Sequence, residues 1–275
     1  MTDQPAHDVT TTDGITIAGT VHGQGPPLVF SPGGLGDADL DWQALLPHLT
    51  GRFTCYLPSL RGRGLSGDHP DLRLDRLVED LVEYVDSIGE ATGLVGWSAG
   101  GMVLDVAARS DAVDAVVAVE PTMFHLLDDQ ERAALGEAVA RMRELAAEGN
   151  MQDAVRAFLG FPFNDEELAV ADRTGYFRAT ARYVPTLLNQ LAQTMQSDAP
   201  GADDPAVFGA ISAPALVLHG TNTKRFLAAG ARHVADHVPN ATVREIPGAG
   251  HAGPLTHPKA LAKALTEFFR PAQPA

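Results

Sequence analysis

Apolar runs that are too continuous to be half exposed alternate along the chain with segments of helical period. The apolar runs predict strands at residues 27–30, 53–57, 94–97, 113–119, 215–218 and 241–246. Helical spacing predicts helices at residues 42–49, 72–87, 102–109, 225–238 and 258–269. Because strands without a polar face must be covered on both sides, the alternation predicts a parallel sheet between layers of helices.

The first part of the chain departs from this pattern. Residues 9–12 and 15–21 alternate apolar and polar positions around Asp13-Gly14. An Asp-Gly pair between two alternating segments is a strong signal for a two-residue hairpin turn. We therefore expect the chain to enter the sheet antiparallel, so that the sheet is mostly rather than wholly parallel.

The alternation stops after Glu120-Pro121. About 85 residues of helical period without a strand follow, far more than a strand-to-helix connection needs. Asp128 and Glu131 have the spacing of a capping box, and helices are predicted at residues 151–159 and 176–196, with a break near Pro185. Residues 197–205 are predicted to be a return linker. We expect a core of residues 1–121 and 211–275, with a helical cap of residues 122–210 inserted after the sixth strand.

Charge and cysteine content narrow the choice of partners. The formal net charge of −15 argues against nucleic acid or an anionic membrane as a partner. The single cysteine, Cys55, excludes an internal disulfide framework. Residues 1–9 lack the pattern of a signal peptide, and no segment approaches the roughly 20 apolar residues that span a bilayer. We expect a cytoplasmic protein, and the sequence leaves its oligomeric state open.

One short motif carries candidate chemistry. The apolar run 94–97 ends in Gly96-Trp97-Ser98-Ala99-Gly100, a G-x-S-x-G pattern followed at once by helical residues. In a nucleophile elbow the serine lies on a strained strand-to-helix turn, and a Cβ at either flanking glycine would collide with neighbouring backbone. In a glycine-rich chain the pattern also arises by chance, so its surroundings decide its meaning.

These surroundings resemble the α/β-hydrolase family over nearly the whole chain. The features that carry the resemblance are a glycine loop at 31–37, Arg61-Gly62-Arg63-Gly64, the elbow, the insertion, and Gly250-His251 after the last strand. The resemblance implies an eight-stranded α/β-hydrolase fold in which Ser98 is the nucleophile and His251 its general base. The chemistry agrees, because serine is a weak nucleophile until an imidazole takes its proton.

The third member of such a triad is not where many relatives carry it. Their acid follows the seventh strand, whereas here no carboxylate occurs from Ser212 to Ala235 and Thr223 stands near the usual position. Glu120 ends the sixth strand, at the sheet edge where ligand-facing groups gather, and Pro121 favours an extended backbone there. We assign Glu120 as the acid; the alternative is a cap or salt-bridge partner for the inserted helices.

A narrower resemblance follows from this relocated acid. Residues 31–37 and 119–122, with Ser98 and His251, are similar to the zearalenone hydrolases, lactonases with a Ser-Glu-His triad. That likeness implies a resorcylic macrolide lactone as substrate. By position, the amides of Gly34 and Ala99 would form the oxyanion hole.

Trp97, Leu35 and Tyr183 are expected to contact substrate. Apolar residues of the insertion either cover a substrate pocket or only pack the insertion onto the core. These residues are Leu126, Leu127, Phe158, Phe161, Phe163, Phe177, Tyr183, Leu187 and Leu188.

The sequence thus predicts a carboxylic ester hydrolase that acts on a small hydrophobic ester or lactone through an acyl-Ser98 intermediate. No cofactor or metal is implied, since His125 with Asp128 and Asp129 is explained by the start of a helix. Two alternatives remain open on the same fold. One is a cofactor-free dioxygenase, and the other is a receptor that uses the cleft for binding.

Overall fold

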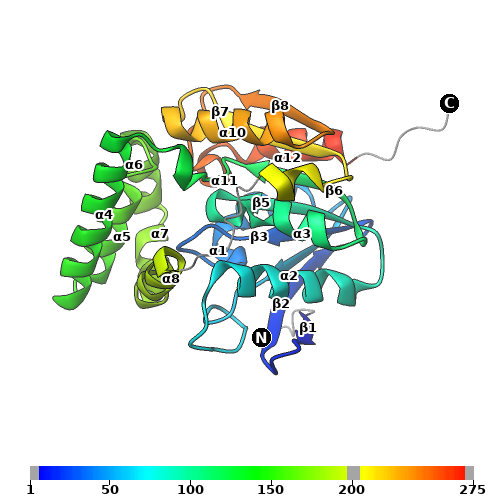
Figure 1. Cartoon of the computed structure of the whole chain (residues 1–275), viewed down its shortest axis with the longest axis horizontal. Coiled ribbons are helices and arrows are strands. Elements are labelled where there is room, and N and C mark those ends of the chain that lie inside the picture. The colour runs from blue at the N-terminus through cyan, green and yellow to red at the C-terminus, as the bar shows by residue number, and fades with distance from the viewer. Residues whose placement is uncertain (1–5, 197–204, 270–275) are drawn as a thin grey trace.

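A computed structural model of the chain describes residues 6–196 and 205–269. Its centre is an eight-stranded sheet in the order β1-β2-β4-β3-β5-β6-β7-β8 (Figure 1). The strand β2 runs antiparallel to β1 and β4, and the remaining pairs are parallel, as predicted. The strands are β1 (Ala6–Thr10), β2 (Thr16–Gly23), β3 (Pro27–Ser31), β4 (Thr54–Pro58), β5 (Thr92–Trp97), β6 (Val113–Val119), β7 (Ala215–Gly220) and β8 (Ala241–Ile246).

The central strands are apolar throughout because both faces of the sheet are covered. All residues of β3, β5 and β7 are buried. Along β3, Leu28 and Phe30 pack into one core cluster and Val29 into another, since successive side chains point to opposite faces. The continuous apolar runs therefore correspond to two separate cores, one on each side of the sheet.

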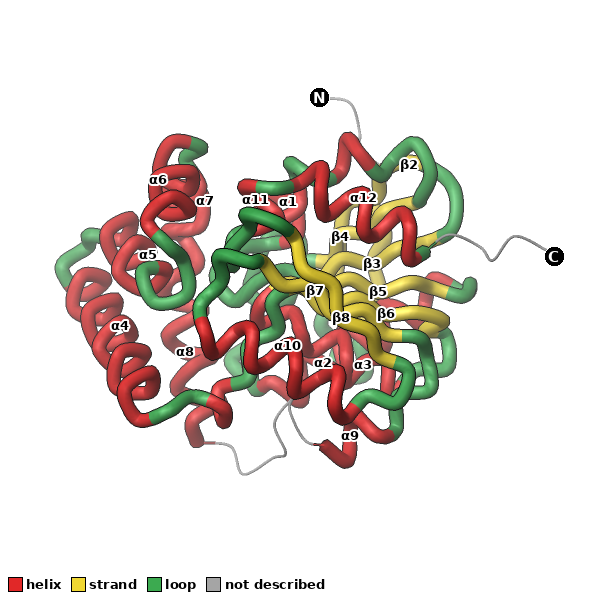
Figure 2. The backbone as a smooth tube through the Cα atoms, turned by 90° about the horizontal axis from the view of Figure 1, so that it is seen from above, coloured by secondary structure: helices red, strands yellow, loops and turns green. Residues whose placement is uncertain are grey.

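Helices form a layer on each face (Figure 2). One face is covered by α1, α11 and α12, and the other by α2, α3, α9 and α10. Their bounds are α1 (Ala38–Trp42), α2 (Leu74–Ile88), α3 (Val103–Arg109), α9 (Pro205–Gly209), α10 (Arg225–His237), α11 (Gly253–Thr256) and α12 (Pro258–Phe268). The described helices include none with the length and apolar character needed to cross a bilayer.

The first predicted helix, residues 42–49, is wrong in extent. The structure has two short pieces instead, α1 and the 3-10 helix η1 (Leu46–His48). The Asp37 side chain accepts a hydrogen bond from the Leu40 amide at 2.9 Å and so starts α1 earlier. Pro47, which has no amide proton, lies within η1 and favours this separate short turn.

The helices of residues 124–196, which follow β6, gather beside the sheet, at the edge where the parallel strands end (Figures 1 and 2). We call residues 124–196 the helical insertion. It contains η3 (Phe124–Leu126), α4 (Asp129–Ala147), α5 (Met151–Leu159), α6 (Asp165–Arg173), α7 (Tyr176–Thr180), η4 (Ala181–Tyr183) and α8 (Val184–Gln196). The capping box predicted at Asp128 and Glu131 is confirmed. The helix α6 was not predicted, although Asn164 and Glu167 form a second capping box at its start.

The predicted break in the last long helix is present. It falls at η4, between α7 and α8, and Pro185 lies in the first turn of α8, where its missing amide proton costs no helical hydrogen bond. The predicted linker of residues 197–205 lies outside the described residues apart from Pro205, which begins α9. That helix packs against α3 and α10, beside the sheet.

Candidate active site

The turn at Ser98 has the geometry that the glycine pattern predicts. Ser98 follows β5 directly and has a φ of 58°, in the left-handed region. A Cβ at Gly96 would lie 1.9 Å from the Gly100 carbonyl oxygen, and one at Gly100 would lie 2.6 Å from that of Pro32. The steric reason for both glycines is confirmed, since any larger residue would push the elbow apart.

His251 lies in the loop after β8 and faces the elbow. Its Nε2 is 2.9 Å from Ser98 Oγ, and the residue is buried. Two contacts hold this loop: Trp97 Nε1 donates to the His251 carbonyl at 2.7 Å, and the Ala252 amide donates to Glu167 Oε1 at 2.6 Å. The imidazole is therefore positioned by residues of both the sheet and the helical insertion.

Glu120 meets the other side of the imidazole. Its Oε2 lies 3.4 Å from His251 Nδ1, and both residues are almost completely buried. The Gly220 amide donates to Glu120 Oε1 at 2.6 Å, and the Thr223 hydroxyl donates to Oε2 at 2.5 Å. Ser98, His251 and Glu120 thus form one chain of polar contacts, and the carboxylate contacts the end of β7 rather than the inserted helices.

The backbone at Glu120 is not extended, although Pro121 led us to expect that. Its φ is 51°, and Ser98 and Glu120 are the two non-glycine residues with positive φ in the described ranges. Such a conformation costs about 1–3 kcal/mol and persists where surrounding contacts fix it, often at functional sites. Here the Glu120 amide donates to the Leu218 carbonyl at 2.8 Å, while its side chain reaches Gly220.

Two threonines touch this chain of contacts and were missed as site residues. Thr122 Oγ1 lies 3.2 Å from Ser98 Oγ, and Thr223 binds Glu120 as described. In the sequence, Thr223 is notable only because it stands near the position where many relatives carry a carboxylate. No local signal marks either hydroxyl, because each meets its partner through the packing of neighbouring strand ends.

The two predicted oxyanion donors lie together beside Ser98. Gly34 and Ala99 both line the pocket, and a methyl group added at Gly34 would lie 3.5 Å from Ala99 Cβ. The Gly33 amide is turned the other way and donates to Asp41 Oδ2 at 2.7 Å. The Gly33 amide therefore binds a buried carboxyl group, whereas Gly34 lines the pocket.

The pocket over Ser98 is a mostly apolar cavity of about 260 Å³. Leu35 and Trp97 line it as expected, but Tyr183 does not. The Tyr183 hydroxyl donates to Asp37 Oδ2 at 2.6 Å and accepts from the Gly64 amide at 3.0 Å. Of the apolar residues considered for the roof, those that line the cavity are Phe158, Phe161, Phe163 and Leu187.

Two buried carboxylates flank the site. Burial raises the pKa of Asp41 to about 7, against hydrogen bonds from the Tyr176 hydroxyl and the Gly33 amide that lower it. Burial also raises the pKa of Glu167, against hydrogen bonds from the backbone of Asn164 and Ala252. Each carboxylate holds one loop of the site, Asp41 the glycine loop and Glu167 the histidine loop.

Comparisons with known proteins agree with this fold. A family model described as the alpha/beta hydrolase fold matches residues 26–258. The chain belongs to the α/β-hydrolase family. This α/β hydrolase is 26% identical to a pimeloyl-(acyl-carrier protein) methyl ester esterase of Chromobacterium violaceum, over 90% of this chain and 95% of that protein.

Two further relatives of this α/β hydrolase have similar coverage. A protein of Mycobacterium tuberculosis named as a non-heme bromoperoxidase is 26% identical over 93% of this chain and 98% of its own length. The crystal structure of an α/β hydrolase from Sphaerobacter thermophilus superposes with a TM-score of 0.75 at 29% identity, covering 96% of this chain and all of that one. An esterase and a bromoperoxidase are thus both named among its relatives.

Proposed function

We propose that the protein hydrolyses a carboxylic ester through an acyl-Ser98 intermediate. The observation that carries the proposal is the 2.9 Å contact between Ser98 Oγ and His251 Nε2, with Glu120 on the opposite ring nitrogen. A serine paired with an imidazole that is itself oriented by a buried carboxylate is suited to nucleophilic catalysis. The relative named as a methyl ester esterase supports the same reaction class.

In the first half of the reaction, Ser98 Oγ attacks the ester carbonyl carbon while His251 Nε2 takes the hydroxyl proton. The carbonyl oxygen becomes an oxyanion, which the Gly34 and Ala99 amides would stabilise. Glu120 offsets the imidazolium charge. Collapse of the tetrahedral intermediate breaks the bond to the alcohol oxygen, which leaves with the proton held by His251.

In the second half, water attacks the acyl carbon of acyl-Ser98 and gives its proton to His251. The second tetrahedral intermediate collapses, the bond to Ser98 Oγ breaks, and His251 returns the proton to the serine. The carboxylic acid is released. For a lactone both products are one molecule, because the alcohol remains tethered to the acyl group.

We propose a lactone or another hydrophobic ester as the substrate. The apolar lining of the cavity supports a small hydrophobic ligand, and aromatic rings of the insertion, Phe158, Phe161 and Phe163, face it. The Ser98, Glu120 and His251 set is also that of the zearalenone-hydrolase-like lactonases which the sequence resembles. A resorcylic macrolide lactone is therefore the first macrolactone to assay.

The test is a panel of p-nitrophenyl esters, simple lactones and macrolactones, assayed with the wild-type protein and Ser98→Ala. We expect turnover of hydrophobic members, a loss of about 10⁴–10⁶-fold in Ser98→Ala, and a Ser98 adduct with an organofluorophosphate by mass spectrometry. Full turnover by Ser98→Ala would contradict the acyl-serine mechanism. Tight ligand binding without turnover would favour a receptor.

A further inference from the structure

A buried arginine lies behind the glycine loop that carries Gly34. Arg63 follows β4, is 2% exposed, and directs its guanidinium at backbone carbonyls rather than at a carboxylate. Its Nη1 donates to the carbonyls of Gly36 at 2.9 Å and Gly33 at 3.3 Å, and its Nη2 donates to that of Gly34 at 2.7 Å. One side chain thus gathers three carbonyls of one short loop.

These contacts decide where the Gly34 amide points. The described backbone has no cis peptide bond, and in a trans peptide the carbonyl and the following amide proton point in opposite directions. When Arg63 draws the Gly33 carbonyl toward itself, the Gly34 N–H turns away from Arg63. Gly34 lies at the pocket beside Ala99, so the amide is presented on the pocket side.

The same loop is held from the other direction. Asp41 accepts from the Gly33 amide at 2.7 Å and from the Tyr176 hydroxyl at 2.7 Å. Because Arg63 binds the Gly33 carbonyl and Asp41 binds the Gly33 amide, neither peptide plane that adjoins Gly33 can rotate freely. An oxyanion donor stabilises a transition state only if it is preorganised in this way.

Arg63 also joins this loop to the helical insertion. Its Nη2 donates to Gln190 Oε1 at 2.9 Å, and Gln190 lines the pocket from α8. Since a guanidinium has donors only, the oxygen of the Gln190 amide must face it. The Arg63 guanidinium is itself buried, and its hydrogen bonds are stronger there than in water.

We propose that Arg63 is a positioning residue for the oxyanion hole, which it sets by holding the carbonyls of the glycine loop and anchoring them to α8. The proposal rests on the ester hydrolysis proposed above. Arg63 acts through the Gly34 amide. It therefore contributes to stabilisation of the transition state rather than to binding of the ground-state substrate.

The test compares Arg63→Met with Arg61→Met, the same exchange at a buried arginine two residues away that has no contact with the glycine loop in the described structure. We expect Arg63→Met to lower kcat about 10²-fold with KM within about threefold of wild type. An alkyl trifluoromethyl ketone, which adds to serine to form an oxyanion, loses affinity by the same factor. The matching methyl ketone, which mimics only the substrate, does not. Arg61→Met keeps the kcat of the folded enzyme.

Arg63→Lys keeps the charge but has fewer donors, and we expect its kcat to lie between those of wild type and Arg63→Met. It replaces Arg63→Met as the test variant if that protein does not fold. An unchanged kcat, or equal losses for both ketones, would overturn the positioning role. This failure differs from failure of the ester hydrolysis itself, which appears as turnover that survives Ser98→Ala.

Discussion

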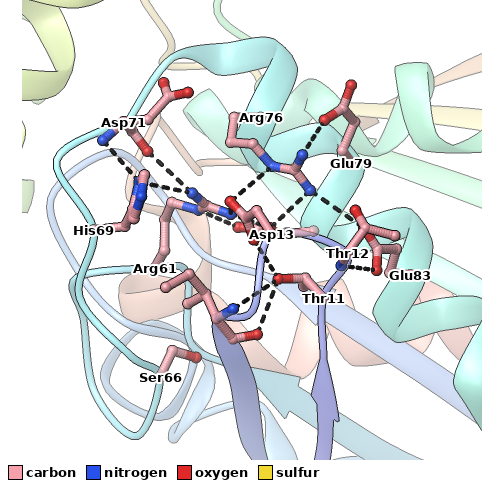
Figure 3. A network of polar contacts seen from close by, with 12 residues as sticks. Thr11, Thr12, Asp13, Arg61, Ser66, His69, Asp71, Arg76, Glu79 and Glu83 are labelled. Carbon is pink, nitrogen blue, oxygen red and sulfur yellow. Dashed lines mark hydrogen bonds and ion pairs between the residues drawn. The ribbon is translucent and has the colours of Figure 1, made fainter.

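Arg61 and Arg63 lie two residues apart on one loop, and both are buried, yet they meet opposite kinds of partner. Arg61 binds carboxylates. It contacts both oxygens of Asp80, each at 2.6 Å. It also contacts Asp13 at 2.9 Å, as Figure 3 shows. Arg63 binds the carbonyls of the glycine loop. The first arrangement pairs opposite charges between the first hairpin and α2, whereas the second holds the backbone of the loop that carries Gly34.

The cluster around Arg61 joins the first hairpin to α2 (Figure 3). Asp13 lies at the hairpin turn, where a hydrogen bond from Thr11 and the Arg61 guanidinium lower its pKa to about 2. Arg76 of α2 forms ion pairs with Glu79 and Glu83. The members of this cluster do not line the pocket. The comparison therefore predicts that substitutions near Arg61 alter stability, and substitutions near Ser98 and Arg63 alter turnover.

The largest effect is expected on the active-site side, from Glu120→Gln. Loss of the carboxylate charge leaves the imidazolium unbalanced, and we expect kcat to fall by about 10³–10⁴-fold while the midpoint of urea unfolding changes little. Thr223→Ala removes one hydroxyl donor to the same oxygen, at 2.5 Å, but leaves the carboxylate charge in place, so it should cost no more than about tenfold. Steady-state kinetics on one ester would measure both. A larger loss in Thr223→Ala than in Glu120→Gln would contradict the assignment of Glu120.

On the structural side, Arg61→Met leaves the Asp80 carboxylate, which is 1% exposed, without its bidentate partner. Removing one member of a buried ion pair costs about 3–5 kcal/mol of unfolding free energy, which urea unfolding would measure. The control is Asp13→Asn at the more exposed end of the cluster, where solvent screens the ion pair and we expect a smaller loss, of about 1–2 kcal/mol. If Arg61→Met lowered kcat without loss of stability, the two arginines would not differ as argued.

The smallest effect depends on pH. It tests whether Asp41, which holds the glycine loop, also contributes to the free energy of unfolding. The pKa of Asp41 rises from 3.8 to about 7 on folding, so the folded state favours the neutral acid. The contribution of Asp41 to stability is complete below about pH 4 and is lost as pH rises through about 7. Relative to Asp41→Asn, which does not ionise, wild type should lose on the order of 1–4 kcal/mol across that range. Urea unfolding of both proteins at the two ends of this pH range would measure the loss. A stability difference between wild type and Asp41→Asn that does not vary with pH would contradict a raised pKa at Asp41.

The sequence was most informative where the signal is local. Apolar runs indicated the buried strands, steric need explained Gly96 and Gly100, and the absence of a carboxylate near Thr223 directed attention to Glu120. Contacts between distant residues gave no such signal. Asp41 and Tyr176 are 135 positions apart, and Arg63 and Gly34 are 29 apart, so their pairing follows only from the folded arrangement. The same limit applies to Tyr183, which we expected at the pocket and which binds Asp37 instead.

The hydrogen bond between Thr223 and Glu120 also determines whether a second carboxylate could occupy position 223. Thr223 Oγ1 lies 2.5 Å from Glu120 Oε2, so an aspartate at 223 would bring a second carboxylate against the first. Two like charges at that separation cannot both remain ionised, and one would take up a proton. Positions 120 and 223 are thus mutually exclusive sites for the acid. A chain with carboxyl groups at both positions would hold one proton between them, so His251 would still face a single negative charge.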